Sequence, residues 1–170
     1  FISTVKDSGV KTFIIHARKG ILKGLSPRQN RNIPPLNYEK VYSIKNDFPD
    51  LEIIINGGIK SISETKNHLN YVDGVMLGRA AYDDPFMLSN IDCEIYSDKK
   101  NEVSRKDLLT EYLDYVHLMT KKGYDPKIML KHVFGLKKGE KDAKRFRVKV
   151  AEIMSSSSLI EKKDELLSMV

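Results

Sequence analysis

The chain has 170 residues, which suits one ordinary domain or one domain with a small second one, and its 41% of hydrophobic residues argues against global disorder. No apolar run approaches the roughly 18 residues that a membrane helix needs, and the single cysteine, Cys93, excludes an internal disulfide or a cysteine-cluster metal site. The lone cysteine and the lack of a signal peptide predict a cytoplasmic protein of a reducing compartment with no membrane or metal partner, and the net charge is +6.

The first ninety residues alternate strand patterns with helix patterns. In chain order we expect the end of a helix closing at Gly9, a strand at 11–17, a helix at 36–49, a strand at 51–58, a helix at 61–70, a strand at 72–80 and a helix starting at 82–89. Ser61 and Glu64 fit the capping box at the start of one helix, and Pro85 suits the first turn of another. This alternation predicts an α/β fold with a parallel sheet, and continuously apolar strands predict that both faces of the sheet are covered.

The remainder of the chain has a different pattern. Residues 91–103 are polar and without periodicity, so we expect a linker there. After Ser104 the periodicity is helical, and four helices are predicted at 105–123, 125–136, 140–156 and 158–170. The predicted domains are therefore 1–90, an α/β part, and 104–170, a small all-α domain.

Basic residues gather in two segments. Residues 16–31 contain five Arg or Lys and no acid, and residues 121–149 contain eleven basic and three acidic side chains. Two basic islands in an otherwise balanced chain favour a polyanionic partner. The alternative is a pair of solvated, lysine-rich faces without a partner.

Glycines follow two of the predicted strands. The run Ile53–Ile55 leads into Asn56-Gly57-Gly58, and the next strand ends in Gly78-Arg79. Ligands of parallel α/β sheets bind at the carboxyl ends of the strands, where glycine lets a phosphate approach the backbone N–H groups. Arg79 adds a charged fork for the same anion. Two glycine sites at successive strand ends therefore predict a phosphate site, whereas one alone would indicate a tight turn.

His16 stands at the carboxyl end of the first predicted strand, on the same expected rim as the glycines. Arg18 and Lys19 follow it and make that rim electropositive. The sequence has no carboxylate pair, Ser-His-Asp arrangement or zinc-ligand spacing to suggest another chemistry. His117 and His132 lie among the predicted helices, where we expect them to be surface or packing residues.

These motifs resemble the carboxyl-terminal half of the tRNA-dihydrouridine synthases, and specifically the A branch, which acts on uridines 20 and 20a of the D-loop. The resemblance covers nearly the whole chain in order. The segments that carry it are FIIHARKGILKGLSPRQNRNIPPLNYEKVY, IIINGGI, VDGVMLGRAAYDDP and MLKHVFGLKKGEKDAKRFR. The first segment is specific to that branch, while the glycine motifs alone would fit many flavin barrels.

The resemblance implies an FMN enzyme with a TIM (β/α)8 barrel, of which this chain supplies the sixth to eighth strands, and a carboxyl-terminal helical domain. It implies that His16, Asn56, Gly57 and Gly58 bind the flavin and that Gly78 and Arg79 close on its phosphate. It further implies tRNA contacts for Arg28 and Arg31 in the first basic segment and for Lys144 and Arg147 in the second. Lys144 replaces the family's usual arginine, which keeps the charge but removes the guanidinium fork. Arg18 is our candidate for the uracil or flavin side of the pocket.

The implied reaction uses NADPH to reduce the flavin, which then gives hydride to C6 of an extruded uracil while a cysteine protonates C5. Cys93 falls in the predicted linker, so its position excludes it from that role. The proton donor is expected upstream, and we expect this chain to be a fragment that lacks it. Three strands cannot close an eight-stranded barrel, so the fragment alone is expected to be inactive, with an unprotected sheet edge.

Two alternatives stay open. One is another FMN- or phosphate-binding barrel oxidoreductase that acts on a small metabolite, which explains the glycines but leaves residues 18–31 and 137–149 without a purpose. The other is a non-catalytic RNA-binding module that uses the helical domain alone. Salt-insensitive or absent tRNA binding would favour the first. Strong tRNA affinity confined to residues 104–170 would favour the second.

Overall fold

The computed structural model describes residues 1–97, 103–155 and 162–170 of the chain. They form two compact units, Phe1–Arg79 and Ala80–Val170, each with a hydrophobic core of its own. Part of the predicted linker, 98–102, and the residues around the junction of the last two predicted helices, 156–161, lie outside the described residues.

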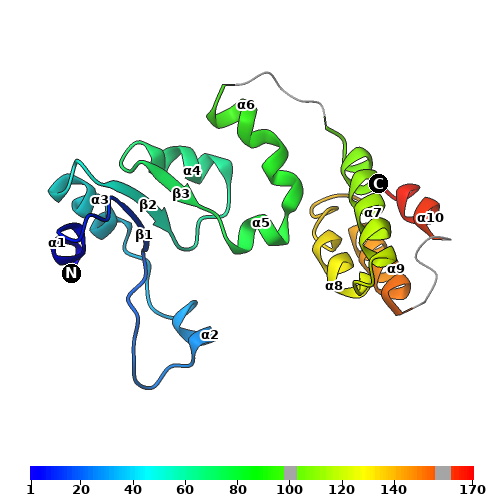
Figure 1. The fold of residues 1–170 in the computed structure, drawn as a ribbon, viewed down its shortest axis with the longest axis horizontal. Coiled ribbons are helices and arrows are strands. Elements are labelled where there is room, and N and C mark those ends of the chain that lie inside the picture. The colour runs from blue at the N-terminus through cyan, green and yellow to red at the C-terminus, as the bar shows by residue number, and fades with distance from the viewer. Residues whose placement is uncertain (98–102, 156–161) are drawn as a thin grey trace. The chain divides into compact units, whose positions relative to one another are not determined.

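The first unit is built around a three-stranded parallel sheet (Figure 1). Its elements are α1 (Ile2–Lys6), β1 (Thr12–His16), α2 (Pro27–Asn30), α3 (Tyr38–Asp47), β2 (Glu52–Asn56), α4 (Ile62–Leu69) and β3 (Gly74–Met76). The strand order is β1-β2-β3, so consecutive strands pair directly across the helical crossovers. The predicted α/β pattern with a parallel sheet is confirmed for this part of the chain.

One face of the sheet carries the core of this unit. The side chains of Ile53 and Ile55 on β2 are fully buried, and they pack with Val41 of α3 and with Phe13 and Ile15 of β1. Side chains alternate across a strand, so the even-numbered residues face the other way. On that second face Ile14 is 53% exposed, and the Cβ position of Gly74 lies 3.0 Å from the Ile54 side chain.

Cover on both faces was predicted, and among the described residues this expectation is wrong. Helix α3 lies in the crossover from β1 to β2, and α4 lies in the crossover from β2 to β3. The sheet order β1-β2-β3 means that both crossovers run in the same direction, and parallel crossovers are nearly always right-handed. Both helices therefore pack on the same side of the sheet, which leaves the face of Ile14 and Ile54 open.

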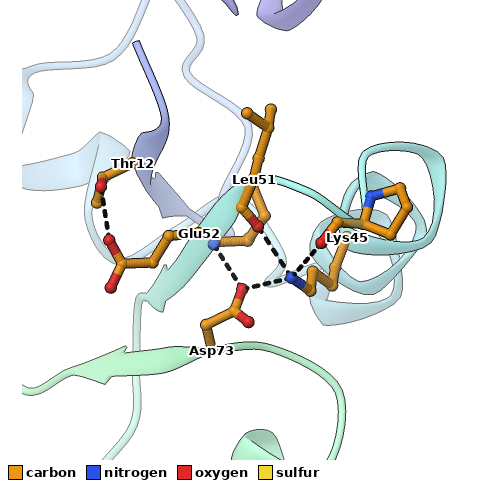
Figure 2. A network of polar contacts seen from close by, with 7 residues as sticks. Thr12, Lys45, Leu51, Glu52 and Asp73 are labelled. Atoms are coloured by element: carbon orange, nitrogen blue, oxygen red, sulfur yellow. Dashed lines mark hydrogen bonds and ion pairs between the residues drawn. The ribbon is translucent and has the colours of Figure 1, made fainter.

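The amino ends of the strands are tied together by a polar network (Figure 2). The Asp73 carboxylate accepts from the Ile53 amide and from the Lys45 ammonium, both at 2.8 Å. Lys45 also donates to the backbone oxygens of Pro49 and Leu51, at 2.9 Å each. The side chain of Lys45 on α3 therefore fixes the turn that starts β2 and the residue that precedes β3.

The second unit is helical. Its elements are α5 (Arg79–Asp83, which begins at the last residue of the first unit), the 3₁₀ helix η1 (Pro85–Asn90), α6 (Ile91–Ile95), α7 (Arg105–Lys121), α8 (Pro126–Leu130), the 3₁₀ helix η2 (Lys131–Val133), α9 (Ala143–Ser155) and α10 (Lys163–Leu167). Fully buried side chains, among them Phe146, Leu109 and Leu130, form its core. Ion pairs of Lys163 with Asp114 and of Lys149 with Glu165 join α10 to α7 and α9.

Segments on either side of the predicted linker pack together in this unit. A Cβ on Gly135 would overlap the Asp83 carbonyl group, so the chain after η2 lies directly against the end of α5. The Arg105 guanidinium stands 3.9 Å from the centre of the Phe86 ring and donates to the Leu136 oxygen at 2.9 Å. These contacts hold η1 to the helices that follow it.

The linker prediction needs one correction. Helix α6 occupies Ile91–Ile95, inside the segment expected to be irregular. Its first turn carries Asp92 and Glu94, which complement the positive end of a helix. The division of the chain into domains at 90 and 104 stays a prediction.

Candidate functional site

Residues at the carboxyl ends of the three strands lie in one row. The register of the sheet pairs His16 with Asn56 and Asn56 with Met76. The Asn56 side-chain amide reaches the Met76 sulfur at 2.9 Å, along the open face of the sheet. The parallel arrangement thus places the ends of all three strands at one edge, as the motif positions predicted.

The two glycines after β2 lie against residues of β1, of α3 and of the loop between them. Gly57 and Gly58 have φ values of +123° and +75°, which favour glycine. A Cβ on Gly57 would stand 3.2 Å from the imidazole of His16, and one on Gly58 would stand 2.5 Å from the Leu36 side chain. The Tyr38 hydroxyl donates to the Gly57 oxygen at 2.8 Å. The absence of side chains therefore lets the exposed His16 ring lie directly beside the backbone of this turn.

Arg18 lies two residues beyond His16, and its guanidinium turns toward the loop. Its Nη1 donates to the Pro34 oxygen and, at 3.3 Å, to the Asn32 oxygen. Its Nε is buried and has no hydrogen-bond partner among the described residues. The side chain therefore braces the loop at its base, and its proposed role toward the uracil or flavin stays a prediction.

The loop between β1 and α3 extends away from the sheet and carries the first basic segment (Figure 1). Helix α2 starts with a capping box between Ser26 and Gln29. The Asn30 side chain bonds both the N–H and the C=O of Ile21, at 2.7 and 2.9 Å. Arg28 and Arg31 are exposed on this braced loop, available to a partner.

Arg79 also contacts this loop. It follows Gly78, around whose missing Cβ nothing lies within 4 Å. The Arg79 Nη1 donates to the Asn32 side-chain oxygen at 2.7 Å, and its Nη2 donates to the Arg31 oxygen at 3.5 Å. The structure thus brings Arg79 to the loop that follows His16, although the two residues are far apart in sequence.

The second predicted pair of tRNA contacts lies on α9. Lys144 and Arg147 are one turn apart and exposed, while Phe146 and Val150 of the same helix are fully buried. The helix is amphipathic, and its buried side fixes the direction in which this pair faces. The pair belongs to the second unit, and its role toward tRNA stays a prediction.

Sequence reasoning missed a buried histidine. His68 of α4 is 7% exposed, its Nδ1 lies 2.6 Å from the Tyr42 hydroxyl, and its ring meets Tyr38 edge to face at 4.5 Å between centroids. Burial lowers the pKa of His68, against the opposing influence of Glu64. The helical spacing of positions 62, 65 and 68 could have predicted this burial, because His68 lies three and six residues after buried Thr65 and Ile62, on the same face of α4.

The cysteine and the other two histidines considered in the sequence lie on or beside helices of the second unit. Cys93 is half-buried on α6, and His132 is exposed with its ring edge-on to Tyr82. His117 is half-buried on α7. Over the described ranges, no group of three metal-ligating side chains comes together, and no helix is long and apolar enough to cross a membrane.

Comparison with known proteins identifies the family. The profile of the dihydrouridine synthase (Dus) family matches residues 1–169. A tRNA-dihydrouridine(20/20a) synthase of Pseudomonas putida is 43% identical over 147 residues, which are 86% of this chain and 44% of that protein. Proteins of the same name from Vibrio cholerae and Haemophilus ducreyi are 41% and 44% identical, over 89% and 82% of this chain and 47% and 43% of their own lengths. The chain spans less than half the length of these curated relatives, and it belongs to the dihydrouridine synthase family.

Proposed function

We propose that this chain is part of an enzyme that reduces uridine to 5,6-dihydrouridine in the D-loop of tRNA, at positions 20 and 20a. The observation that carries the proposal is the arrangement at the strand ends. His16, the Gly57-Gly58 turn and Arg79 all reach the region beside the β1–α3 loop. We infer the reaction from membership of the dihydrouridine synthase family, and we propose the ends of the strands as the place where it occurs.

The open face of the sheet supports a barrel architecture. In a TIM barrel, helices cover the outside of the sheet and the strands' other faces meet inside. Ile14 and Ile54 lie on the uncovered face, and His16 and Asn56 end the same two rows of side chains. The first unit has the layering of three successive β/α segments of such a barrel. We propose the divisions 1–90 for this barrel part, 91–103 for a connection that includes α6, and 104–170 for a helical tRNA-binding domain.

The residues at the strand ends suit FMN. Gly78 is exposed with open space around it, which leaves its backbone accessible to a phosphate, while the positive φ values of Gly57 and Gly58 form the tight turn that packs against His16 and Leu36. His16 would contact the flavin, Asn56 and the two glycines would hold it, and Gly78 with Arg79 would bind its phosphate. When bound, FMN supplies hydride to the uracil after its own reduction by NADPH.

In that reaction, the residues of this chain would bind the cofactor and orient it toward the uracil. Arg79 would neutralise a phosphate with its charged fork. Arg18, fixed to the loop carbonyls of Asn32 and Pro34, would place positive charge beside the pocket. The proton donor to the uracil is not assigned to Cys93, because that residue lies on α6 in the helical unit, among residues that follow the last strand.

Two exposed basic pairs support tRNA as the substrate. Arg28 and Arg31 lie on the loop beside the cofactor residues, and Lys144 and Arg147 lie on α9. Phosphate contacts position a folded RNA, while the target base leaves its stack to reach the pocket. A small-metabolite oxidoreductase would have no use for either pair.

The experiment that tests the proposal uses the intact protein. We expect it to purify with bound flavin and to form dihydrouridine in a tRNA transcript when NADPH is supplied, as measured by nucleoside mass spectrometry. Arg79→Ala should weaken FMN binding by roughly 10- to 100-fold, because one charge-assisted contact to phosphate is lost. The matched control is Lys11→Ala, which removes an exposed charge at the opposite end of β1.

Absence of flavin together with absence of dihydrouridine would refute the proposal. Flavin binding without salt-sensitive tRNA binding would favour a small-metabolite oxidoreductase instead.

A further inference from the structure

Asn32 lies between two arginines that come from different parts of the first unit. Its side-chain oxygen accepts from Arg79 Nη1 at 2.7 Å, and its backbone oxygen accepts from Arg18 Nη1 at 3.3 Å. The first of these bonds spans 47 residues. Asn32 is thus the residue through which the segment after β3 holds the loop after β1.

The loop that Asn32 anchors carries the basic pair that the proposed function assigns to tRNA. Arg31 is its immediate neighbour, and the Arg31 oxygen accepts from Arg79 Nη2 at 3.5 Å. Arg28 lies one turn earlier, on α2. A shift of the Arg79 guanidinium therefore acts directly on the Arg31 backbone and the Asn32 side chain, next to the helix that carries Arg28.

We propose that Asn32 is a positioning residue that couples binding of a phosphate at Gly78-Arg79 to placement of Arg28 and Arg31 for RNA. The inference rests on the proposed function and adds to it a link between two sites. Binding of FMN should strengthen tRNA binding, and by linkage tRNA should strengthen FMN binding by the same factor.

The chemistry of an amide suits this link. A guanidinium has five N–H donors, and the bonds to Asn32 and to the Arg31 oxygen use only its two terminal nitrogens. A neutral amide oxygen orients Arg79 without cancelling its charge, so the charge stays available to a phosphate. Arg79 is an exposed, long side chain whose ordering costs conformational entropy. A phosphate that fixes it would lower the cost of fixing the loop.

The test measures tRNA affinity of the intact protein with and without saturating FMN. For the wild type we expect the ratio of the two dissociation constants to be on the order of fivefold or more, in favour of the FMN-loaded protein. In Asn32→Ala the ratio should fall toward one, and hydrogen exchange of residues 21–33 should no longer slow when FMN is added. Asn32→Asp keeps an acceptor for Arg79 but neutralises its charge. This variant should therefore keep the protection of residues 21–33 against hydrogen exchange and lose affinity for FMN.

Asn30→Ala is the matched control. Asn30 braces the same loop through Ile21 but has no bond to Arg79, so its loss should weaken tRNA binding equally with and without FMN. A merely structural role of Asn32 would give that same result. The coupling is therefore overturned if Asn32→Ala keeps the wild-type ratio, or if the wild-type ratio is one. Failure of the wild type to bind either FMN or tRNA would overturn the proposed function, and the coupling with it.

Discussion

At the scale of single residues, Gly57 occupies a position that requires both a positive φ and the absence of a side chain. Its φ of +123° lies outside the range of L-residues, and its missing Cβ leaves room for the His16 ring. We expect Gly57→Ala to lower the free energy of unfolding by about 1–3 kcal/mol, through backbone strain and displacement of that ring. Urea denaturation of the intact protein measures it.

Gly20→Ala is the control for this substitution, because Gly20 has open space around its Cβ position and no positive φ. Its effect should stay within about 0.5 kcal/mol. Equal effects at the two positions would mean that the turn after β2 tolerates a side chain.

His68 makes stability depend on pH. Burial holds the pKa of the folded imidazole below its ordinary 6.5. Below that pH the unfolded chain takes up a proton that the folded chain resists, so the stabilising contribution is present above 6.5 and is lost as the pH falls. We expect the urea midpoint to decrease from about pH 7.5 to about pH 5.5, and His68→Gln to remove part of that decrease.

The exposed His132 provides the comparison. His132→Gln makes the same imidazole-to-amide change at an exposed position. An unchanged slope in His68→Gln would show that the buried ring does not control the pH dependence.

At the scale of elements, the contact between α3 and the strands depends on Asp73 and Lys45. Burial alone would raise the pKa of Asp73, but the Ile53 amide and the Lys45 ammonium outweigh it and hold the pKa below 3.8. This stabilising contribution is present above pH 3.8 and is lost as the pH falls through the lowered folded value. Asp73→Ala should cost about 1–3 kcal/mol at neutral pH, because the Ile53 N–H and Lys45 each lose a partner.

Chemical denaturation at pH 7 and pH 3 tests this prediction, since the difference between wild type and Asp73→Ala should shrink at the lower pH. The exposed Asp50 is the control position. A loss of stability that is the same at both pH values would contradict the ionic part of the argument.

Local sequence signals predicted most of these elements. Ser61 is the N-cap of α4, as predicted, and its hydroxyl accepts from the Glu64 amide at 3.1 Å. The reciprocal half of the capping box differs, because the Glu64 side chain accepts from the Lys60 amide instead. The predicted strand at 72–80 is only Gly74–Met76, since Gly78 and Arg79 already belong to the turn and to α5.

At the scale of the whole molecule, the proposed association with RNA would depend on charge. Each phosphate contact that is lost should lower the slope of log affinity against log salt by roughly 0.7–0.9. We expect the double substitution of Arg28 and Arg31 by alanine to lower the slope for tRNA by about one to two, and that of Lys144 and Arg147 to do the same.

Filter binding at several salt concentrations measures these slopes, with Lys11→Ala, which removes one exposed charge outside both pairs, as the control. If only the α9 pair changes the slope, the RNA-binding role belongs to the helical unit alone.

The site was only partly predictable from the sequence, for a physical reason. That His16 and Asn56 would end neighbouring strands follows from strand periodicity and parallel pairing, which are local and topological signals. The bond between Arg79 and Asn32 spans 47 residues and leaves no local signal, and neither does the partnership of His68 with Tyr42 across 26. Helix α6 was missed because its polar sequence has no marked periodicity.

The pairing of Ile14 with Ile54 and of His16 with Asn56 has a consequence for how this chain tolerates change in length. Deleting one residue inside β1 would turn its row of Ile14 and His16 into the packed layer beneath α3 and would send the imidazole away from the turn at Gly57. Length variation among relatives should therefore collect in the exposed part of the loop near Lys23, and the strand itself should keep a constant number of residues.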